Sequence, residues 1–223
     1  MELQGKKVLV FGSGKSGIGA SDLLAKVGAF PVIYDGNAET DKDAVVHKTD
    51  GTYPVTVYAG ELPKEVQESL DLVVLSPGVP TDIPLVKSFY EQGLPVWGEV
   101  ELAYRVGDGE VLAITGTNGK TTTTALLGKI MQDARESVFV VGNIGTPYTS
   151  KALELNNTAR PKITSSTTST SIVISVFDKS VALFRAICFS AKLSIARHCS
   201  FVLLCRTAIS LTYRYSTDFL HIP

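Results

Sequence analysis

The chain has 223 residues with a formal net charge of −1, and 44% of its residues are hydrophobic. This content is enough for a substantial core, and the near-neutral charge gives no electrostatic reason to expect nucleic acid or an anionic membrane as a partner. The apolar run after Lys7 ends at Gly12, which is too short for a signal peptide, so we expect a cytoplasmic protein. The three cysteines lack metal-ligand spacing, which argues against a zinc site.

From residue 7 to about residue 141, short apolar runs alternate with longer amphipathic ones, a pattern typical of a parallel sheet with crossover helices. The fold class is therefore α/β. We expect a Rossmann-like parallel-sheet domain at residues 1–108 and the beginning of a P-loop-type α/β domain at 109–155, which is apparently truncated. The predicted strands are 8–11, 31–34, 72–75, 111–115 and 138–141, and the predicted helices are 16–27, 83–92 and 121–133.

Residues 156–223 differ in kind from the rest of the chain. Residues 1–155 contain 20 acidic and 13 basic side chains, whereas residues 156–223 contain 2 acidic and 8 basic ones. All 19 glycines lie at or before Gly145, although tight turns and helix ends ordinarily use glycine. Charges interrupt the apolar runs too often for a membrane span. We interpret this segment as an atypical tail of the kind that a shifted reading frame produces, with an unusual α+β tail as the alternative.

A first glycine motif follows the predicted strand 8–11. Gly12, Gly14 and Gly17 form a G-x-G-x-x-G turn that opens a helix, where free N–H groups and the helix dipole favour a phosphate. Asp35 ends the second predicted strand, where a carboxylate can accept hydrogen bonds from a ribose or a base. By itself this motif indicates nucleotide binding only weakly, because glycines here also serve strand–helix packing.

A second and more specific motif lies between the strand 111–115 and the helix 121–133. It reads Gly116-Thr117-Asn118-Gly119-Lys120-Thr121-Thr122. In such a loop, backbone N–H groups surround phosphate oxygens, Lys120 reaches the β- and γ-phosphates, and the Thr121 hydroxyl can bind Mg²⁺. The ordinary P-loop has glycine at position 114, where this chain has isoleucine, so the general template matches only in part.

The second motif resembles the ATP loop of the Mur ligases and their folylpolyglutamate synthetase relatives. Several further pieces agree with that family in the same order along residues 1–155: the Gly12 turn, Asp35, Ser76-Pro77-Gly78-Val79, Gly98-Glu99-Val100-Glu101-Leu102 and Gly142-Asn143-Ile144-Gly145. The set is most similar to the members that add D-glutamate.

The resemblance implies a role for each matching residue. The ATP-binding residues would be Gly116, Thr117, Asn118, Gly119, Lys120, Thr121 and Thr122, with Thr121 as the metal ligand and Lys120 and Asn143 as catalytic residues. The UDP-substrate residues would be Lys15, Ser16, Asp35, Gly78 and Asn143. The implied cofactors are ATP and Mg²⁺, the implied substrates are UDP-N-acetylmuramoyl-L-alanine and D-glutamate, and we expect a monomer.

In the family, ATP phosphorylates the substrate carboxylate, and the D-glutamate amine attacks the acyl phosphate. The family's metal-binding Glu-x-Ser-Ser-Phe-Gln-Leu strand does not follow the Gly-Asn-Ile-Gly turn here, nor do its later metal-binding His and carbamylated Lys. We therefore expect an incomplete and inactive fragment. Two alternatives stay open. A NAD-type dehydrogenase would explain Gly12 and Asp35 but not the second motif, and a non-catalytic nucleotide-binding remnant would share the family's ancestry without its activity.

Overall fold

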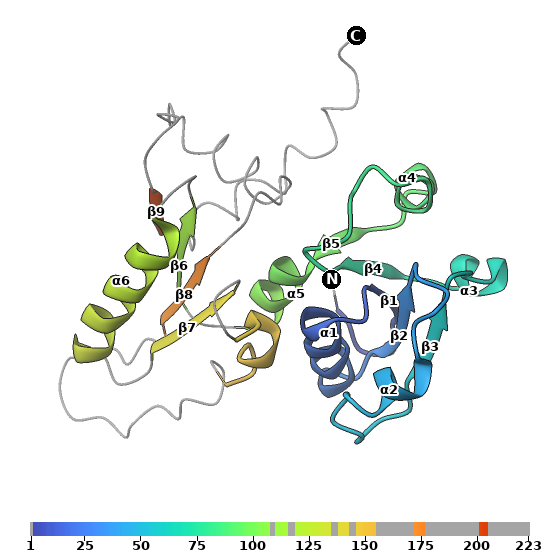
Figure 1. Cartoon of the computed structure of the whole chain (residues 1–223), viewed down its shortest axis with the longest axis horizontal. Coiled ribbons are helices and arrows are strands. Elements are labelled where there is room, and N and C mark those ends of the chain that lie inside the picture. Colours follow the sequence, from blue (N-terminus) through green and yellow to red (C-terminus); the bar gives the residue numbers. More distant parts are fainter. Residues whose placement is uncertain are drawn as a thin grey trace, which may run out of the picture. The chain divides into compact units, whose positions relative to one another are not determined.

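A computed structural model describes residues 2–107, 110–115, 119–134, 138–142, 146–154, 172–176 and 201–204. The chain divides into two compact units. The first unit comprises Met1–Val106 together with Pro147–Leu153, and the second comprises Gly107–Thr146 together with Glu154–Pro223. Each unit contains a sheet, with several helices around the sheet of the first unit and α6 beside the sheet of the second (Figure 1).

The first unit contains a five-stranded parallel sheet with the strand order β3-β2-β1-β4-β5. This order confirms the predicted Rossmann-like α/β class, and the predicted strands 8–11, 31–34 and 72–75 are present. The strands are β1 (Lys7–Phe11), β2 (Phe30–Asp35), β3 (Thr56–Ala59), β4 (Leu72–Leu75) and β5 (Val96–Gly98). The helices are α1 (Lys15–Lys26), α2 (Lys42–Val46), α3 (Lys64–Glu68), α4 (Pro84–Glu91) and α5 (Glu99–Val106).

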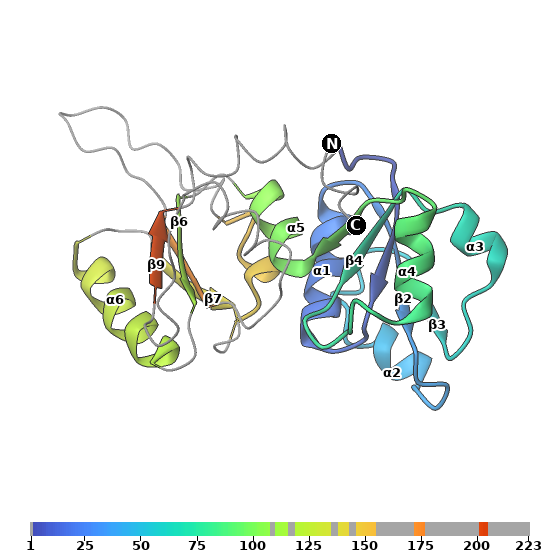
Figure 2. The same cartoon turned by 90° about the horizontal axis from the view of Figure 1, so that it is seen from above.

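Strand β1 is buried on both faces because helices cover both sides of the sheet. Leu9 and Phe11 pack in one hydrophobic cluster with Val86 and Phe89 of α4. Val8, which is fully buried, points to the opposite face because side chains alternate along a strand. Figure 2 shows α1 and α4 on opposite sides of this sheet. This double coverage explains why β1 reads as a continuous apolar run.

The segment Pro147–Leu153 folds back onto the first unit. Its short 3₁₀ helix η1 (Tyr148–Ser150) packs against α1 and α5. Tyr148, Thr149 and Ala152 are all buried. A Cβ atom at Gly19 of α1 would lie only 2.7 Å from the Thr149 hydroxyl oxygen, so the missing side chain permits the close approach. The sequence-based division at residue 108 assigned this segment to the second domain, because it follows a predicted strand of that domain.

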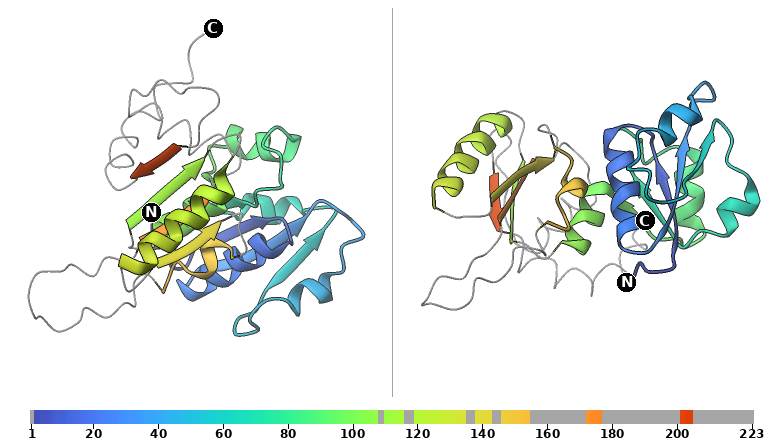
Figure 3. Two further views of the ribbon diagram at one scale, coloured as in Figure 1. Left: turned by 60° about the vertical axis from the view of Figure 1, so that its left-hand side comes forward. Right: turned by 90° about the horizontal axis from the view of Figure 1, so that it is seen from below.

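The second unit contains a four-stranded sheet with the order β7-β8-β6-β9. Its elements are β6 (Glu110–Thr115), α6 (Lys120–Ala134), β7 (Val138–Gly142), β8 (Ile172–Val176) and β9 (Phe201–Leu204). Leu127 and Met131 of α6 pack against Leu112 and Ile114 of β6, and Figure 3 shows α6 lying along one face of the sheet. The predicted strands 111–115 and 138–141 and the predicted helix 121–133 are present.

Two strands of this sheet come from the segment that we interpret as an atypical tail. Strand β8 pairs in parallel with both β7 and β6, and β9 pairs antiparallel to β6. Apart from these two strands, residues 156–223 lie outside the described residues. The interpretation as a shifted reading frame therefore stays a prediction.

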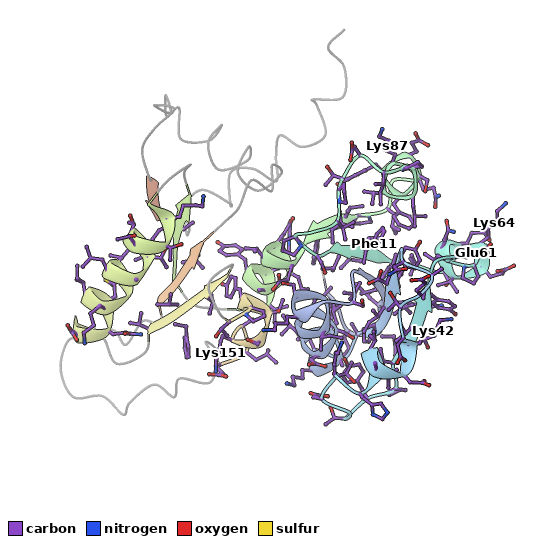
Figure 4. All side chains as sticks on the ribbon, in the orientation of Figure 1. Phe11, Lys42, Glu61, Lys64, Lys87 and Lys151 are labelled. Atoms are coloured by element: carbon purple, nitrogen blue, oxygen red, sulfur yellow. The ribbon has the colours of Figure 1, made fainter. Side chains whose placement is uncertain are left out.

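Three lysines on helices of the first unit lie on its outside. Figure 4 shows Lys42, Lys64 and Lys87 pointing outward from α2, α3 and α4, whereas Phe11 lies within the sheet. These lysines belong to three separate helices. Among the helices that the structure describes, none combines the length and apolar character that a membrane span requires.

The burial of Tyr148 gives a test of the docked segment. The change Tyr148→Ala is expected to lower the free energy of unfolding of the first unit by about 3 kcal/mol or more, because it removes a fully buried ring. Emission of Trp97, the only tryptophan in the chain and a buried residue of this unit, reports unfolding in urea. The control Tyr90→Ala changes a half-exposed tyrosine and is expected to cost less than about 1 kcal/mol. Equal costs for the two variants would contradict stable docking of the segment.

Candidate functional site

The loop after β1 lies at the point where the order of the first sheet reverses. Strand β1 pairs with β2 on one side and with β4 on the other. In open parallel sheets the connections leave two such strands in opposite directions, and the crevice outside their carboxyl ends binds ligands. The loop itself is tightly folded. A Cβ atom at Gly17 would lie 1.8 Å from the carbonyl oxygen of Gly12, so only glycine fits at position 17.

The N-terminus of α1 faces open space beside this loop. Gly14 is the N-cap and makes no side-chain cap hydrogen bond, and a Cβ atom added there would meet nothing within 4 Å. Lys15 is exposed and Ser16 is half-buried in the first helical turn, which contains no acidic residue. The first N–H groups of a helix have no partner within the helix and favour an anion. Lys15 and Ser16 thus lie where a phosphate group could bind.

Asp35 lies beside the same loop, at the carboxyl end of β2. Its Oδ2 atom accepts hydrogen bonds from the Ser13 N–H, at 3.2 Å, and from the Ser13 hydroxyl, while its Oδ1 atom accepts one from the Asn37 N–H at 3.0 Å. Burial alone would raise the pKa of Asp35, but hydrogen bonds from Ser13, Asn37 and Thr40 outweigh it and hold the pKa below its ordinary value. The ionised carboxylate therefore orders the loop, and its remaining lone pairs can still accept from a ligand.

The turn after β4 follows the strand that pairs with β1 on its other side. The Val79 N–H donates to the Ser76 carbonyl oxygen at 3.0 Å, and Gly78 is exposed in this turn with nothing near its Cβ position. The hydroxyl of Ser76 is buried and has no hydrogen-bond partner among the described residues. It lies next to the Cβ positions of Gly12 and Gly17, at 2.7 and 3.2 Å. Sequence reasoning selected Gly78 from this turn and did not select Ser76.

Glu99 is a buried carboxyl group that sequence reasoning quoted only as part of a motif. It is the first residue of α5 and is 5% exposed. Its Oε1 atom accepts a hydrogen bond from the Thr149 hydroxyl at 3.1 Å, and the Thr149 N–H and the Ser16 hydroxyl interact with the same carboxyl group and lower its pKa. Burial raises the pKa of the Glu99 carboxyl above its ordinary value, and these hydrogen bonds oppose the rise only in part.

The second candidate site begins at the start of α6. Gly119 has a φ of +75°, a left-handed conformation that favours glycine, and its carbonyl oxygen accepts the helical hydrogen bond of the Thr123 N–H at 2.9 Å. Lys120 is half-buried, and Thr121 and Thr122 are exposed in the first turn. The predicted ATP-binding residues Gly116, Thr117 and Asn118 lie outside the described residues.

The turn that carries Asn143 leaves the same edge of the second sheet. Strands β6, β8 and β7 run parallel, and both Ile114 and Gly142 stand opposite Val176 in the register. The carboxyl ends of β6 and β7 are therefore two strand spacings apart, about 10 Å. Asn143 itself lies outside the described residues. The Gly142 N–H donates to the Thr146 carbonyl oxygen at 2.9 Å, which brings the two ends of this turn together.

Thr121 is the one predicted metal ligand, and it lies in the part of the chain that the structure describes. Within the described ranges, no three His, Cys, Asp or Glu side chains form a group that could hold a metal ion. The Thr121 hydroxyl lies exposed at the N-terminal turn of α6. One hydroxyl suits Mg²⁺, which takes oxygen ligands and usually keeps several waters and phosphate oxygens.

The fold and these sites define a two-unit α/β protein in which each unit carries a strand–loop–helix junction with glycine. Residues 6–98 match the model for the MurD-like N-terminal domain of Mur ligases, and residues 114–190 match the model for the Mur ligase middle domain. The chain belongs to the Mur ligase family. The second match extends into the segment after residue 155, which we had set apart from the resemblance.

Curated relatives give the same result. The chain is 51% identical over 154 residues to UDP-N-acetylmuramoylalanine–D-glutamate ligase of Lachnospira eligens, covering 69% of this chain and 34% of the relative. It is 50% identical over 157 residues to the enzyme of that name from Lachnoclostridium phytofermentans, covering 70% and 35%. The chain thus spans about a third of the length of these relatives.

The chain is also similar to several solved structures, among them the murein peptide ligase of Psychrobacter arcticus. The sequence identity is 20%, the TM-score is 0.47, and the match covers 78% of this chain and 38% of that one. A TM-score below 0.5 does not establish a common fold by itself, so the family assignment depends on the sequence matches.

The raised pKa of Glu99 leads to a pH dependence of stability. The native state holds the Glu99 proton to higher pH than the unfolded state does. The contribution of Glu99 is therefore expected to fall as pH rises from about 4.5, the ordinary value, through the raised pKa. The measured quantity is the free energy of unfolding of the unaltered chain minus that of Glu99→Gln, followed by Trp97 emission across this pH range.

The matched control for this measurement is Glu101→Gln, on the same helix. Glu101 is only partly buried and pairs with Arg105 at 2.7 Å. The control is expected to lack the downward slope, because water reaches the Glu101 carboxyl group, whose side chain is 23% exposed. A difference for Glu99→Gln that grows with pH would contradict the assigned direction.

Proposed function

We propose that this chain provides the UDP-substrate site and the ATP loop of an ATP-dependent ligase that adds D-glutamate to UDP-N-acetylmuramoyl-L-alanine in peptidoglycan synthesis. The observation that carries the proposal is the presence of two separate strand–loop–helix junctions with glycine, β1–α1 and β6–α6, in one chain. A NAD-type dehydrogenase uses only the first junction and leaves the second unexplained. The names of the relatives support the choice of substrates.

The first unit would bind the uridine nucleotide. The N-terminus of α1 would receive the diphosphate through the N–H groups of its first turn, with Lys15 and Ser16 beside it. Asp35 and Gly78 follow the ends of β2 and β4 on either side of this loop, and the family resemblance assigns Asn143 to the same substrate. The buried Ser76 hydroxyl lies against Gly12 and Gly17 and so contributes to the close packing of the loop that would hold the diphosphate.

The second unit would bind ATP. Backbone N–H groups of the loop from Gly116 to Gly119 would surround the phosphates, and Lys120 would contribute a positive charge to the γ-phosphate. The Thr121 hydroxyl would hold Mg²⁺, which when bound neutralises charge between the nucleotide phosphates. For transfer, the substrate carboxylate must lie in line with the γ-phosphate, so the residues of this loop act chiefly by orientation and charge neutralisation.

The change Gly14→Val tests the uridine site. The backbone of Gly14, with φ −75° and ψ −174°, accepts valine, and its Cβ position is open. The variant is therefore expected to fold normally and to lose UDP binding, because the side chain fills the space that the diphosphate needs. Isothermal calorimetry with UDP measures the loss, and nicotinamide dinucleotides in parallel test the dehydrogenase alternative. Unchanged UDP affinity would remove the assignment.

The change Lys120→Ala tests the ATP loop. It is expected to weaken ATP binding by about 10-fold to 100-fold, the effect of losing a charge-assisted hydrogen bond. The control is Lys129→Ala on the same helix, where the lysine is exposed and pairs with Asp133 at 2.8 Å; it is expected to leave ATP affinity unchanged. Equal effects of the two changes would argue that this loop binds no phosphate.

We also expect no turnover by the 223-residue chain. With ATP, UDP-N-acetylmuramoyl-L-alanine and D-glutamate, phosphate release is expected to stay at background, since the family's other metal and substrate groups are not recognisable in this sequence. Turnover that disappears in Lys120→Ala would show that the chain is an active ligase.

A further inference from the structure

Glu99 joins two parts of the first unit that are far apart in the sequence. The Thr149 hydroxyl, in the docked segment, donates a hydrogen bond to its Oε1 atom at 3.1 Å, and the Ser16 hydroxyl, in the first turn of α1, interacts with the same carboxyl group. Glu99 is 5% exposed and Thr149 is 3% exposed, so water competes little for these bonds. A single carboxyl group therefore determines the orientation of both partners.

The bond to Ser16 bears directly on the proposed uridine site. Ser16 is the second residue of α1, where the backbone N–H has no partner within the helix. The interaction with Glu99, the first residue of α5, favours an orientation of the Ser16 hydroxyl toward that helix. The backbone N–H of the same residue stays at the helix end, where an anion would bind. Glu99 thus orders the first turn without occupying the crevice.

Thr149 is close in sequence to the second unit, because the docked segment begins directly after Thr146. Thr146 is paired with Gly142 by a backbone hydrogen bond, and the docked segment begins at the next residue, Pro147. The turn that carries Asn143 is therefore followed directly by residues held on the first unit. The close packing of Thr149 against Gly19 adds a steric constraint to the same contact.

We propose that Glu99 is a positioning residue that holds Ser16 and Thr149 together, so that nucleotide binding at α1 and docking of Pro147–Leu153 strengthen each other. The ligand-binding half of this inference rests on the proposed uridine site. Coupling between two equilibria is reciprocal. Weaker docking of Pro147–Leu153 must therefore destabilise the first turn of α1, and nucleotide binding must stabilise the docked segment.

Amide hydrogen exchange of the 223-residue chain, followed by mass spectrometry with and without UDP, tests both directions. In the unaltered chain, UDP is expected to slow exchange in Pro147–Leu153. The change Thr149→Val keeps the shape and removes the hydroxyl. It is expected to speed exchange in the first turn of α1 and to weaken UDP binding about fivefold, the effect of one hydrogen bond.

Three further variants separate coupling from simple loss of packing. Thr149→Ser keeps the hydroxyl and is expected to restore UDP affinity and slow exchange in α1. Gly19→Ala adds a methyl group against the Thr149 hydroxyl, touches neither Glu99 nor Ser16, and is expected to reproduce the effects of Thr149→Val. Glu101→Gln, two residues beyond Glu99, is the control and is expected to change neither quantity.

Two results would overturn the proposal. One is that Thr149→Val speeds amide exchange in Pro147–Leu153 but leaves the exchange rate in the first turn of α1 unchanged. The docking of this segment would then be a local structural contact. The other is UDP binding of unaltered strength in both Thr149→Val and Gly19→Ala. If the unaltered chain binds no UDP, the proposed uridine site fails, while exchange in the ligand-free variants still decides whether Glu99 couples the two segments.

Discussion

Parallel pairing on both sides of β1 is the constraint on which the first unit depends. A strand paired on both edges and covered on both faces is apolar where it is buried, as residues 8–11 are, and polar groups become available to a ligand only beyond its carboxyl end. At that point the chain turns through Gly12 and Gly17, whose backbones approach too closely for any side chain at position 17. The glycine turn, the open N-terminus of α1 and the ends of β2 and β4 are brought together by this one arrangement.

The docked segment adds a second constraint, because it packs on the first unit although the residues before and after it belong to the second. Pro147–Leu153 lies between stretches of the second unit in the sequence, yet its buried residues pack on α1 and α5. The sequence around Tyr148, Thr149 and Ala152 has no periodic apolar pattern that predicts a buried segment. Their burial depends on Gly19 leaving space and on Glu99 offering an acceptor. Ser16 contacts the same carboxyl group, so the packing of this segment and the order of the nucleotide loop share one residue.

Membership in the Mur ligase family fits this arrangement of two units, each with its own glycine junction. The two junctions also differ physically. In the first, the Asp35 carboxylate accepts hydrogen bonds from Ser13 of the loop, and the Glu99 carboxyl group accepts one from the Thr149 hydroxyl and interacts with Ser16. In the second, the described part offers a lysine and two hydroxyl groups at the helix start, a composition that suits the higher charge of a triphosphate and its metal ion.

The sequence by itself determined the α/β class, the principal strands and the two glycine junctions, because these depend on local patterns. The apolar run at β1, the G-x-G-x-x-G turn and the Gly-Lys-Thr before α6 are each contained within a few residues. The partners of Asp35, the orphaned hydroxyl of Ser76 and the contact from Glu99 to Thr149 were decided only by the tertiary structure. Glu99 and Thr149 are 50 positions apart, and no local pattern records that α5 and η1 will meet against α1. Burial makes these contacts strong, and burial is a property of the assembled unit.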